Sequence, residues 1–352
     1  MLYQTKNPHG GDIYDGAVTL DYSANTNPFG TPQAILDAVT AALGDMHRYP
    51  DPYCRALVEK ISRFECVPKN YILCGNGAAD LIYAYCAAVK PERAAQLAPT
   101  FSEYGLGLGR VGCTDIRNYI LRQENGFALE EGILSWLEEN RPQVLFLCNP
   151  NNPTGKTMDP ALLERILGKT KELHIRLFVD ECFLDLTDGG ESLKPFLKEN
   201  PHVFLLKAFT KSYGMAGIRL GYCLSSDAEL LTRMSRASQP WNVSSLAQAA
   251  GKAALDQKEF LEKTRVLIRD QRKYLKAELE ALGFWVSDSE TNFLLFRGPE
   301  DFHTELREKF GIAIRNCDNY IGLGSGWYRI AVRLPEENRR LIAAMREILG
   351  RA

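Results

Sequence analysis

The stretch that decides the fold is Thr210-Lys-Ser-Tyr-Gly-Met-Ala-Gly-Ile-Arg-Leu-Gly-Tyr222. It places a primary amine, Lys211, and a permanent cation, Arg219, on one glycine-punctuated turn. A lysine amine forms a Schiff base with a carbonyl group, and the arginine fork binds phosphate more specifically than lysine does. The pair therefore suits a cofactor that is both an aldehyde and a phosphate. Because a lone lysine is usually a solvated surface residue, this interpretation depends on the rest of the chain.

A second polar turn follows the apolar run at 71–74. Gly75-Asn-Gly77 leads from this run into a helical pattern over 81–89. Glycines at a strand-to-helix turn allow backbone N–H groups to converge on an anion at the helix N-terminus. Gly-x-Gly is also common in ordinary turns, so this motif gains weight only from its neighbours.

Two further apolar runs end in polar residues. Residues 144–148 lead into Asn-Pro-Asn-Asn-Pro-Thr-Gly at 149–155, a turn-forming sequence whose side-chain amides can donate hydrogen bonds. Residues 175–179 end in Asp180-Glu181. A carboxylate at the mouth of a buried strand is costly unless it is paired. A protonated pyridine nitrogen is such a partner, and the pairing makes the ring an electron sink.

In their order and spacing, these four segments resemble the fold-type I pyridoxal-phosphate (PLP) enzymes of the aspartate aminotransferase superfamily. The resemblance spans nearly the whole chain. It implies an α/β fold with a large PLP-binding domain, in which a mostly parallel sheet lies between helices. A smaller α+β domain is expected from the C-terminal part together with the N-terminal segment.

The alternation of apolar runs with helical patterns supports the same α/β architecture. The expected strands of the large sheet are 71–74, 94–98, 144–148, 175–179, 203–206 and 220–224. Ligands of such sheets bind outside the carboxyl ends of the strands. The four polar segments all fall there, so we expect them to form one site.

We divide the chain into three parts. Residues 1–30 are expected to join the small domain, 31–245 to form the large PLP-binding domain, and 246–352 to form the small C-terminal α+β domain. An amphipathic helix over 259–282 would connect the two domains. Thr31-Pro32 is predicted to be the N-cap and first position of a helix over Gln33 to Leu43. The small domain is expected to contain strands at 292–296, 312–315 and 327–333, and a last helix from Pro335.

The composition excludes several classes of protein. With 352 residues, 45% hydrophobic and 24% charged, the chain is an ordinary soluble globular protein. A net charge of −2 gives no electrostatic reason to expect binding to nucleic acid or membrane. Nine scattered cysteines without Cys-x-x-Cys, and an N-terminus without a secretory signal, favour free thiols in the cytoplasm. Five histidines without ligand spacing argue against a metal site.

The resemblance assigns roles around the cofactor, pyridoxal 5'-phosphate. It implies that Lys211 forms the Schiff base and later moves a proton, and that Asp180 pairs with the pyridine nitrogen. Asn152 would face the phenolic oxygen of the ring, and Phe101 would stack on the ring. The residues implied to hold the cofactor phosphate are Gly77, Ala78, Thr210 and Arg219.

Two matches extend beyond the cofactor. Tyr49, in Arg-Tyr-Pro, matches a tyrosine that reaches the cofactor phosphate of the partner subunit, which implies a homodimer with shared active sites. Arg329 matches the arginine that binds the substrate carboxylate or its equivalent. Without the resemblance, Arg329 and Arg333 would be interpreted as a solvated strand face, and the role of Arg333 stays open.

Two positions depart from the family pattern. Ala208 stands where many relatives have a serine or threonine that touches the cofactor phosphate, so one hydroxyl ligand is lost. Phe183 stands where aminotransferases commonly have a tyrosine bonded to the phenolic oxygen. Its absence leaves Asn152 with more of that task.

Two subfamilies are most similar: the histidinol-phosphate aminotransferases and the threonine-phosphate decarboxylases of cobalamin biosynthesis. The stretches that favour the decarboxylases are His9-Gly-Gly, the Asp-Tyr-Ser-Ala-Asn-Thr-Asn27-Pro segment, Asp180-Glu-Cys-Phe183, and residues 314–333. A basic pocket would suit a substrate that carries both phosphate and carboxylate. We expect substrate contacts from His9, Asn27, Arg315 and Arg329, with His9 and Arg315 on the phosphate.

The expected function is therefore decarboxylation of a small phosphorylated amino acid, L-threonine O-3-phosphate, to (R)-1-aminopropan-2-yl phosphate. L-serine O-phosphate differs by one methyl group, and a pocket discriminates a methyl by only about 1–3 kcal/mol. The first alternative is a histidinol-phosphate aminotransferase that uses 2-oxoglutarate. The second is a non-catalytic binding module that has kept the fold, although the joint presence of Lys211, Asp180 and Asn152 argues against it.

Overall fold

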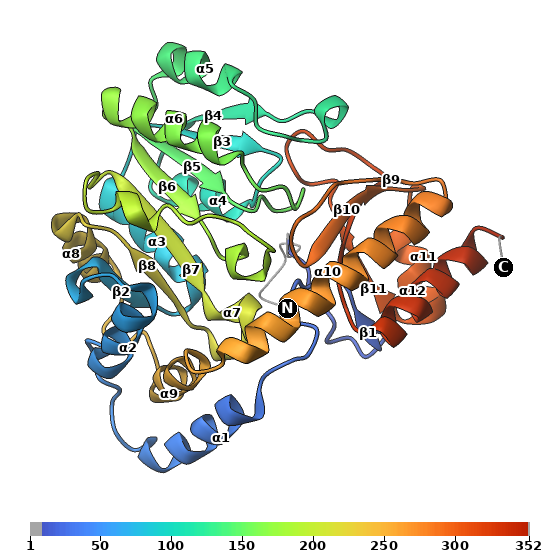
Figure 1. The fold of residues 1–352 in the computed structure, drawn as a ribbon, viewed down its shortest axis with the longest axis horizontal. Helices are drawn as coiled ribbons and strands as arrows, with labels where there is room; N and C mark the ends of the chain where they lie inside the picture. Colours follow the sequence, from blue (N-terminus) through green and yellow to red (C-terminus); the bar gives the residue numbers. More distant parts are fainter. Residues whose placement is uncertain (1–8, 351–352) are drawn as a thin grey trace.

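The computed structural model describes residues 9–350, so residues 1–8 of the expected N-terminal segment lie outside it. Within this range, seven strands form the large sheet, in the order β2-β8-β7-β6-β5-β3-β4 (Figure 1). The strands are β2 (Ile72–Gly75), β3 (Arg93–Ala98), β4 (Asp115–Ile120), β5 (Val144–Cys148), β6 (Arg176–Asp180), β7 (Val203–Ala208) and β8 (Gly221–Leu224). All run in one direction except β8, which is antiparallel to both of its neighbours. The predicted α/β fold is confirmed.

Helices cover both faces of the large sheet because its strands are apolar on both sides. On one face, Phe146, Phe178 and Phe204 pack against α3 (Gly77–Val89), α4 (Glu103–Arg110) and α8 (Ala228–Ala237). On the other face, Leu145 and Leu177 belong to a core shared with further helices. These are α1 (Gln33–Ala42), α2 (Arg55–Glu65), α5 (Gly132–Asn140), α6 (Pro160–Glu172) and α9 (Ser245–Ala254).

A small sheet has the strand order β12-β13-β10-β9, with antiparallel pairs throughout. Its strands are β9 (Trp285–Val286), β10 (Phe293–Arg297), β12 (Arg315–Asn316) and β13 (Trp327–Ala331). The helices α11 (Phe302–Phe310) and α12 (Pro335–Ile348) contribute Phe302 and Leu341 to the core beside it. The N-terminal strand β1 (Leu20–Asp21) pairs in parallel with β11 (Ile312–Ala313), which places this early segment beside the C-terminal part of the chain (Figure 1).

Helix α10 (Lys258–Ala281) links the two cores. Its residue Leu261 belongs to the core of the large sheet, whereas Leu275 and Leu279 belong to the core of the small sheet. Figure 1 shows this helix running from the large sheet to the small one. We propose that the two sheets mark two domains, with the boundary near residue 245 and with residues up to 30 joined to the smaller one.

The remaining regular elements are short. Helix α7 (Phe209–Ser212) follows β7 directly. The 3-10 helices are η1 (Leu43–Asp45), η2 (Lys69–Tyr71), η3 (Gln123–Asn125), η4 (Leu184–Leu186), η5 (Lys194–Phe196) and η6 (Ala216–Ile218). Within residues 9–350, no helix has the length and apolar character needed to cross a membrane.

Three local predictions differ from the structure. Thr31 is not the N-cap of α1: Pro32 occupies that position, and the Thr31 hydroxyl donates to the carbonyl of Gly214 at 2.8 Å. The strand predicted over 312–315 is divided between β11 and β12, because its two halves pair with different strands. Strand β4 was not predicted, since it lies at the edge of the sheet and is half-buried.

All nine cysteines lie within the described range and are free thiols, and all except Cys66 are buried. Most lie in the two cores of the large sheet. The cellular compartment that such thiols favour stays a prediction.

Candidate active site

The polar segments singled out in the sequence meet at one edge of the large sheet. Strands β2, β3, β5, β6 and β7 run in one direction, so their carboxyl ends lie together. The residues that end or follow these strands carry different chemical groups. Ligands of open α/β sheets bind at this edge, outside the carboxyl ends of the strands. From this edge come Gly77, Phe101, Asn152, Asp180 and Lys211.

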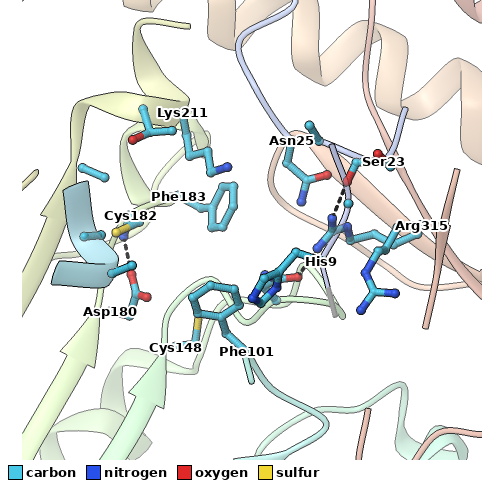
Figure 2. Close-up of a pocket in the computed structure, with 18 of the residues that line it drawn as sticks. His9, Ser23, Asn25, Phe101, Cys148, Asp180, Cys182, Phe183, Lys211 and Arg315 are labelled. Atoms are coloured by element: carbon cyan, nitrogen blue, oxygen red, sulfur yellow. Dashed lines mark hydrogen bonds between the residues drawn. The ribbon is translucent and has the colours of Figure 1, made fainter. Parts of the chain in front are cut away.

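A cavity of about 220 Å³ lies at this edge, between the large sheet and the residues near the small sheet. Figure 2 shows Lys211, Asp180 and Phe183 on one side of it, and Asn25, Ser23 and Arg315 on the other. The predicted site residues that line the cavity are His9, Ala78, Phe101, Asn152, Asp180, Thr210, Lys211, Arg219, Arg315 and Arg329.

Lys211 is held on α7, the short helix that continues β7. Burial lowers the pKa of its amine to about 8, and the positive charges of Arg329 and Arg219 act in the same direction. The ring of Phe183 lies 5.7 Å from its Nζ atom. A buried amine with a lowered pKa is a nucleophile near neutral pH, as Schiff-base chemistry requires.

Asp180 ends β6 and is 5% exposed. Its Oδ1 atom accepts the backbone N–H of Cys182 at 2.9 Å, and its Oδ2 atom accepts the hydroxyl of Tyr104 at 2.7 Å. Burial raises the pKa of this carboxyl, although both bonds and the charge of Lys211 oppose that shift. A cation placed beside Asp180 in the cavity would offset the cost of its burial.

Gly77 and Arg219 form a close contact at the N-terminus of α3. Gly77 has φ +81°, and a Cβ atom there would lie 2.4 Å from Arg219 Nη2, so only glycine fits this position. The Arg219 guanidinium also donates to the carbonyl of Ala216 at 3.1 Å. A helix N-terminus, an arginine fork and the neighbouring Thr210 hydroxyl together provide donors for one phosphate group.

Arg329 reaches from β13 to the residues of the large sheet. Its Nη1 atom donates to Asn152 Oδ1 at 2.5 Å, and its Nη2 atom donates to the carbonyl of Ser23 at 2.7 Å. The bond to Oδ1 leaves Asn152 Nδ2 as the donor of that amide. The Arg329 Nε atom is buried and has no partner among the described residues.

Arg315 and Arg329 lie directly opposite each other on β12 and β13. Both are buried, at 9% and 5% exposure, and both line the cavity. Like charges at directly opposed positions destabilise a sheet, and buried charges need partners. Arg315 donates to Asn319 Oδ1 at 2.7 Å and also to the backbone carbonyl of Asn316. The arrangement therefore favours an anionic ligand.

His9 lies at the edge of the same cavity, next to Phe101, with 5.6 Å between the two ring centroids. Its Nε2 atom bonds to Glu103 Oε1 at 2.5 Å. The N-terminal segment, within the described residues, therefore contributes the side chain of His9 to this cavity.

Three predicted site residues, Gly77, Asn27 and Tyr49, are not among those that line the cavity. Asn27 is buried, and its Nδ2 atom donates to the carbonyl of Ser212 at 2.8 Å and to Thr264 Oγ1 at 3.0 Å, so it ties the N-terminal segment to α7 and α10. Tyr49 is 79% exposed and stacks on Trp241, with ring centroids 4.6 Å apart.

Several cavity residues were missed in the sequence. Asn25 and Ser23 come from the segment after β1, and the buried Asn25 Oδ1 atom has no partner within the described range. Cys148 and Cys182 line the cavity beside Asp180, and Tyr104 supports that carboxylate from α4. Asn25 belongs to the Asp-Tyr-Ser-Ala-Asn-Thr-Asn27-Pro segment, two residues before Asn27. Only the folded segment shows which of the two asparagines lines the cavity.

The two departures from the family pattern both face the cavity. Phe183 and Ala208 line it, and Phe183 packs edge-on against Phe293 of β10, with centroids 5.0 Å apart. At both positions, an apolar side chain stands where relatives commonly have a hydroxyl group. The cavity therefore has fewer uncharged hydrogen-bond donors at these two positions. A bound cofactor would depend more on Asn152 and Arg219 for its hydrogen bonds.

Comparison with known proteins agrees with this geometry. The family model for aminotransferases of class I and II matches residues 18–345. This chain belongs to that family. The binding-module alternative is therefore disfavoured, because the family is enzymatic and its lysine stands in the cavity.

Individual relatives show which enzymes the chain is similar to. The chain is 38% identical to a threonine-phosphate decarboxylase from Salmonella typhimurium, over 97% of this chain and 96% of the relative. It is 34% identical to a histidinol-phosphate aminotransferase from Desulfitobacterium hafniense, over 94% of this chain and 92% of the relative. The solved histidinol-phosphate aminotransferase from Clostridium acetobutylicum has a TM-score of 0.87 at 25% identity, covering 95% of this chain and all (100%) of that one.

Proposed function

We propose that this enzyme binds pyridoxal 5'-phosphate and decarboxylates L-threonine O-3-phosphate to (R)-1-aminopropan-2-yl phosphate. The observation that carries the proposal is the buried, directly opposed pair of Arg315 and Arg329 facing the cavity of Lys211. One cationic group, Arg219, already lies beside Gly77 at the helix N-terminus. Two further arginines and His9 suit a substrate with two anionic ends.

The residues present fit the cofactor. The Lys211 amine has a lowered pKa, burial raises the pKa of the Asp180 carboxyl in a way that a bound cation would oppose, and Asn152 keeps an amide donor. Gly77, Ala78, Thr210 and Arg219 would hold the phosphate, and Phe101 would stack on the ring. When bound, pyridoxal phosphate supplies an electron sink for the negative charge that develops at the substrate α-carbon.

The protein's own task is orientation, because the bond held perpendicular to the ring is the one that breaks. Arg329 would hold the substrate carboxylate through its buried Nε atom, while its Nη atoms stay anchored on Asn152 and Ser23. Arg315 and His9 would bind the substrate phosphate. After carbon dioxide leaves, Lys211 Nζ would deliver the proton to the α-carbon.

Asn25 is a further candidate for substrate contact, in place of the predicted Asn27. Asn25 lines the cavity, and its buried Oδ1 atom has no hydrogen-bond donor among the described residues. A substrate that carries an N–H or O–H group would satisfy this acceptor. Asn27, in contrast, already donates to two protein oxygens.

We also propose a cytoplasmic homodimer with shared sites. Tyr49 and Trp241 form an exposed aromatic pair, and Met46 and Tyr53 nearby in sequence are 67% and 69% exposed. Exposed apolar groups of this kind mark protein interfaces. A partner subunit on this surface would bring its Tyr49 toward the cofactor phosphate, as in the family. The product would supply the aminopropanol linker of cobalamin.

The alternative is a histidinol-phosphate aminotransferase, which the 34% identity to such an enzyme favours. Histidinol phosphate has no carboxylate, so it would leave one of the two opposed arginines without a ligand group. A side-by-side assay separates the reactions. Purified PLP-loaded protein is given L-threonine phosphate, L-serine phosphate, or histidinol phosphate with 2-oxoglutarate, and kcat/KM is measured for each. We expect threonine phosphate to be preferred. A preference for histidinol phosphate with glutamate formation would replace the proposal by the alternative.

A further inference from the structure

The first three described residues, 9–11, are packed tightly against the chain near the small sheet. A Cβ atom at Gly10 would lie 2.3 Å from the carbonyl oxygen of Ser23, so this approach requires glycine. The backbone N–H of Gly11 donates to Ser23 Oγ at 2.7 Å. Ser23 in turn accepts Arg329 Nη2 on its carbonyl oxygen. The backbone that carries His9 is therefore fixed to the same residue as a cavity arginine.

The side chain of His9 reaches the opposite side, the large sheet. Its Nε2 atom lies 2.5 Å from Glu103 Oε1, and Glu103 begins helix α4. The other carboxylate oxygen, Oε2, accepts the hydroxyl of Tyr83 from α3. The guanidinium of Arg110 lies over the ring of that tyrosine, 4.1 Å from its centroid. Both carboxylate oxygens of Glu103 therefore have partners. One bonds to His9 of the N-terminal segment, and the other bonds to Tyr83 of α3.

Burial acts to raise the pKa of the Glu103 carboxyl, because the residue is only 8% exposed. The bonds from His9 and Tyr83 nevertheless hold the pKa of this carboxyl below its ordinary value. Glu103 is therefore a carboxylate at neutral pH. A charged acceptor makes a stronger hydrogen bond to an imidazole than a neutral one would.

Glu103 does not line the cavity of Lys211, whereas His9 does. His9 also lines a neighbouring cavity of about 420 Å³, and the two cavities share Gly10, Ser23 and Arg315. Of the two described side chains that bond to Glu103, His9 lines this cavity and Tyr83 does not. Figure 2 shows His9 between Phe101 and the side of the cavity that carries Arg315.

We propose that Glu103 is a positioning residue, which holds the His9 imidazole at the junction of the two cavities so that it meets the phosphate of the substrate together with Arg315. The identity of that ligand rests on the proposed function. Glu103 touches neither substrate nor cofactor. Because it belongs to α4 and His9 to the N-terminal segment, their bond also fastens that segment across the edge of the site.

The test is a double-mutant cycle on the PLP-loaded protein, with His9→Asn, Glu103→Gln and the combined variant. The probes are 2-aminoethyl phosphate and ethanolamine, and their binding is measured by calorimetry. We expect Glu103→Gln to weaken the phosphorylated probe about 10-fold and to change ethanolamine by less than about twofold, since one charge-assisted contact is affected. In the His9→Asn background, Glu103→Gln should have no further effect.

Kinetics give a second readout. For L-threonine phosphate, Glu103→Gln should raise KM and leave kcat within about threefold, because binding rather than the chemical step is affected. Glu103→Asp should recover part of the affinity, and it serves as the test variant if Glu103→Gln does not fold. Glu138→Gln is the matched control, since this exposed glutamate pairs only with Lys169 among the residues that bond to its side chain in the described structure.

Equal losses for both probes, or additive effects of His9→Asn and Glu103→Gln, would overturn the positioning role and leave Glu103 a structural acid. The proposed reaction is tested independently of the role of Glu103. If the wild-type protein binds 2-aminoethyl phosphate but releases no carbon dioxide from threonine phosphate, the reaction is wrong, and the cycle still decides the role of Glu103.

Discussion

At the scale of single residues, the site brings two arginine charges close to the amine of Lys211. The amine of Lys211 is buried near the guanidinium groups of Arg329 and Arg219, and all three influences lower its pKa, to about 8. At pH 7.5, roughly a quarter of such an amine is neutral, against about 0.1% for an ordinary lysine. The two cations that we propose as ligand-binding groups therefore also lower the pKa of the proposed nucleophile.

This coupling predicts a pH dependence for cofactor capture. The apoprotein should bind pyridoxal phosphate covalently with a rate that rises with pH and has its midpoint near pH 8, followed by absorbance. Arg329→Gln removes a neighbouring positive charge, so it should raise the pKa of Lys211 and move the midpoint to higher pH. Arg307→Gln is the control, since Arg307 pairs with Asp15 away from the lysine. A wild-type midpoint above pH 10 would show that burial does not act on Lys211.

A second residue-scale prediction concerns Arg315. Arg315→Ala removes a charged donor to phosphate, so kcat/KM for threonine phosphate should fall about 10- to 100-fold. Binding of unphosphorylated threonine should change by less than about threefold. Arg307→Ala should leave both values near wild type, because its guanidinium contacts Asp12 and Asp15. An equal loss for threonine and threonine phosphate would remove Arg315 from the phosphate site.

At the scale of elements, the first turn of α4 supports both ends of the cavity. Glu103 bonds to His9, and the next residue, Tyr104, donates to Asp180. Tyr104 is fully buried and stacks near Phe146 of β5, with centroids 5.4 Å apart. One short helix therefore orients the histidine on one side and the carboxylate on the other.

Replacement of Tyr104 by phenylalanine tests the second of these contacts. Loss of a hydrogen bond to a charged group should destabilise the protein by about 1.5–3 kcal/mol, measured by denaturant unfolding, and should weaken cofactor binding. The bond lowers the pKa of Asp180, so its removal should raise that pKa further. Tyr85→Phe is the matched control, because the buried Tyr85 hydroxyl has no partner within residues 9–350. Equal changes in both variants would mean that the hydroxyl of Tyr104 does not support Asp180.

The sequence was sufficient for the elements that carry strong local signals. Apolar runs ending in Gly77, Asn152, Asp180 and Lys211 predicted both the strands and the edge at which they meet. It was insufficient where the outcome depends on contacts between distant segments. Neither the bond of Tyr104 to Asp180 nor the bond between His9 and Glu103 has a sequence pattern of its own.

The dependence on contacts between distant segments also explains why the sequence did not distinguish Asn25 from Asn27. The two asparagines lie two residues apart, and both are buried, at 2% exposure. Asn27 makes its bonds to α7 and α10, whereas Asn25 lines the cavity. Motif matching predicted a substrate contact for Asn27, whereas Asn25 is the member of the pair that lines the cavity, because only the packed segment determines which residue lies there.

At the scale of the whole molecule, the exposed aromatic pair predicts an assembly. Tyr49 and Trp241 stack on the surface at 79% and 47% exposure. Light scattering should show a homodimer, and Trp241→Asp should shift it toward monomer and weaken cofactor binding, because Tyr49 would no longer reach the partner site. Tyr14→Asp is the control, since Tyr14 is 90% exposed and lies outside the pair. A wild-type monomer at micromolar concentration would rule out the shared site.

The fate of the substrate carboxyl carbon tests the central claim most directly, because it reports which bond at the α-carbon breaks. PLP-loaded protein is incubated with L-threonine phosphate labelled with carbon-13 in the carboxyl group, and the products are followed by NMR. We expect the label to appear in carbon dioxide and bicarbonate, in equal amount to aminopropanol phosphate. Label retained in a 2-oxo acid, formed only when an amino acceptor is added, would contradict it and establish an aminotransferase.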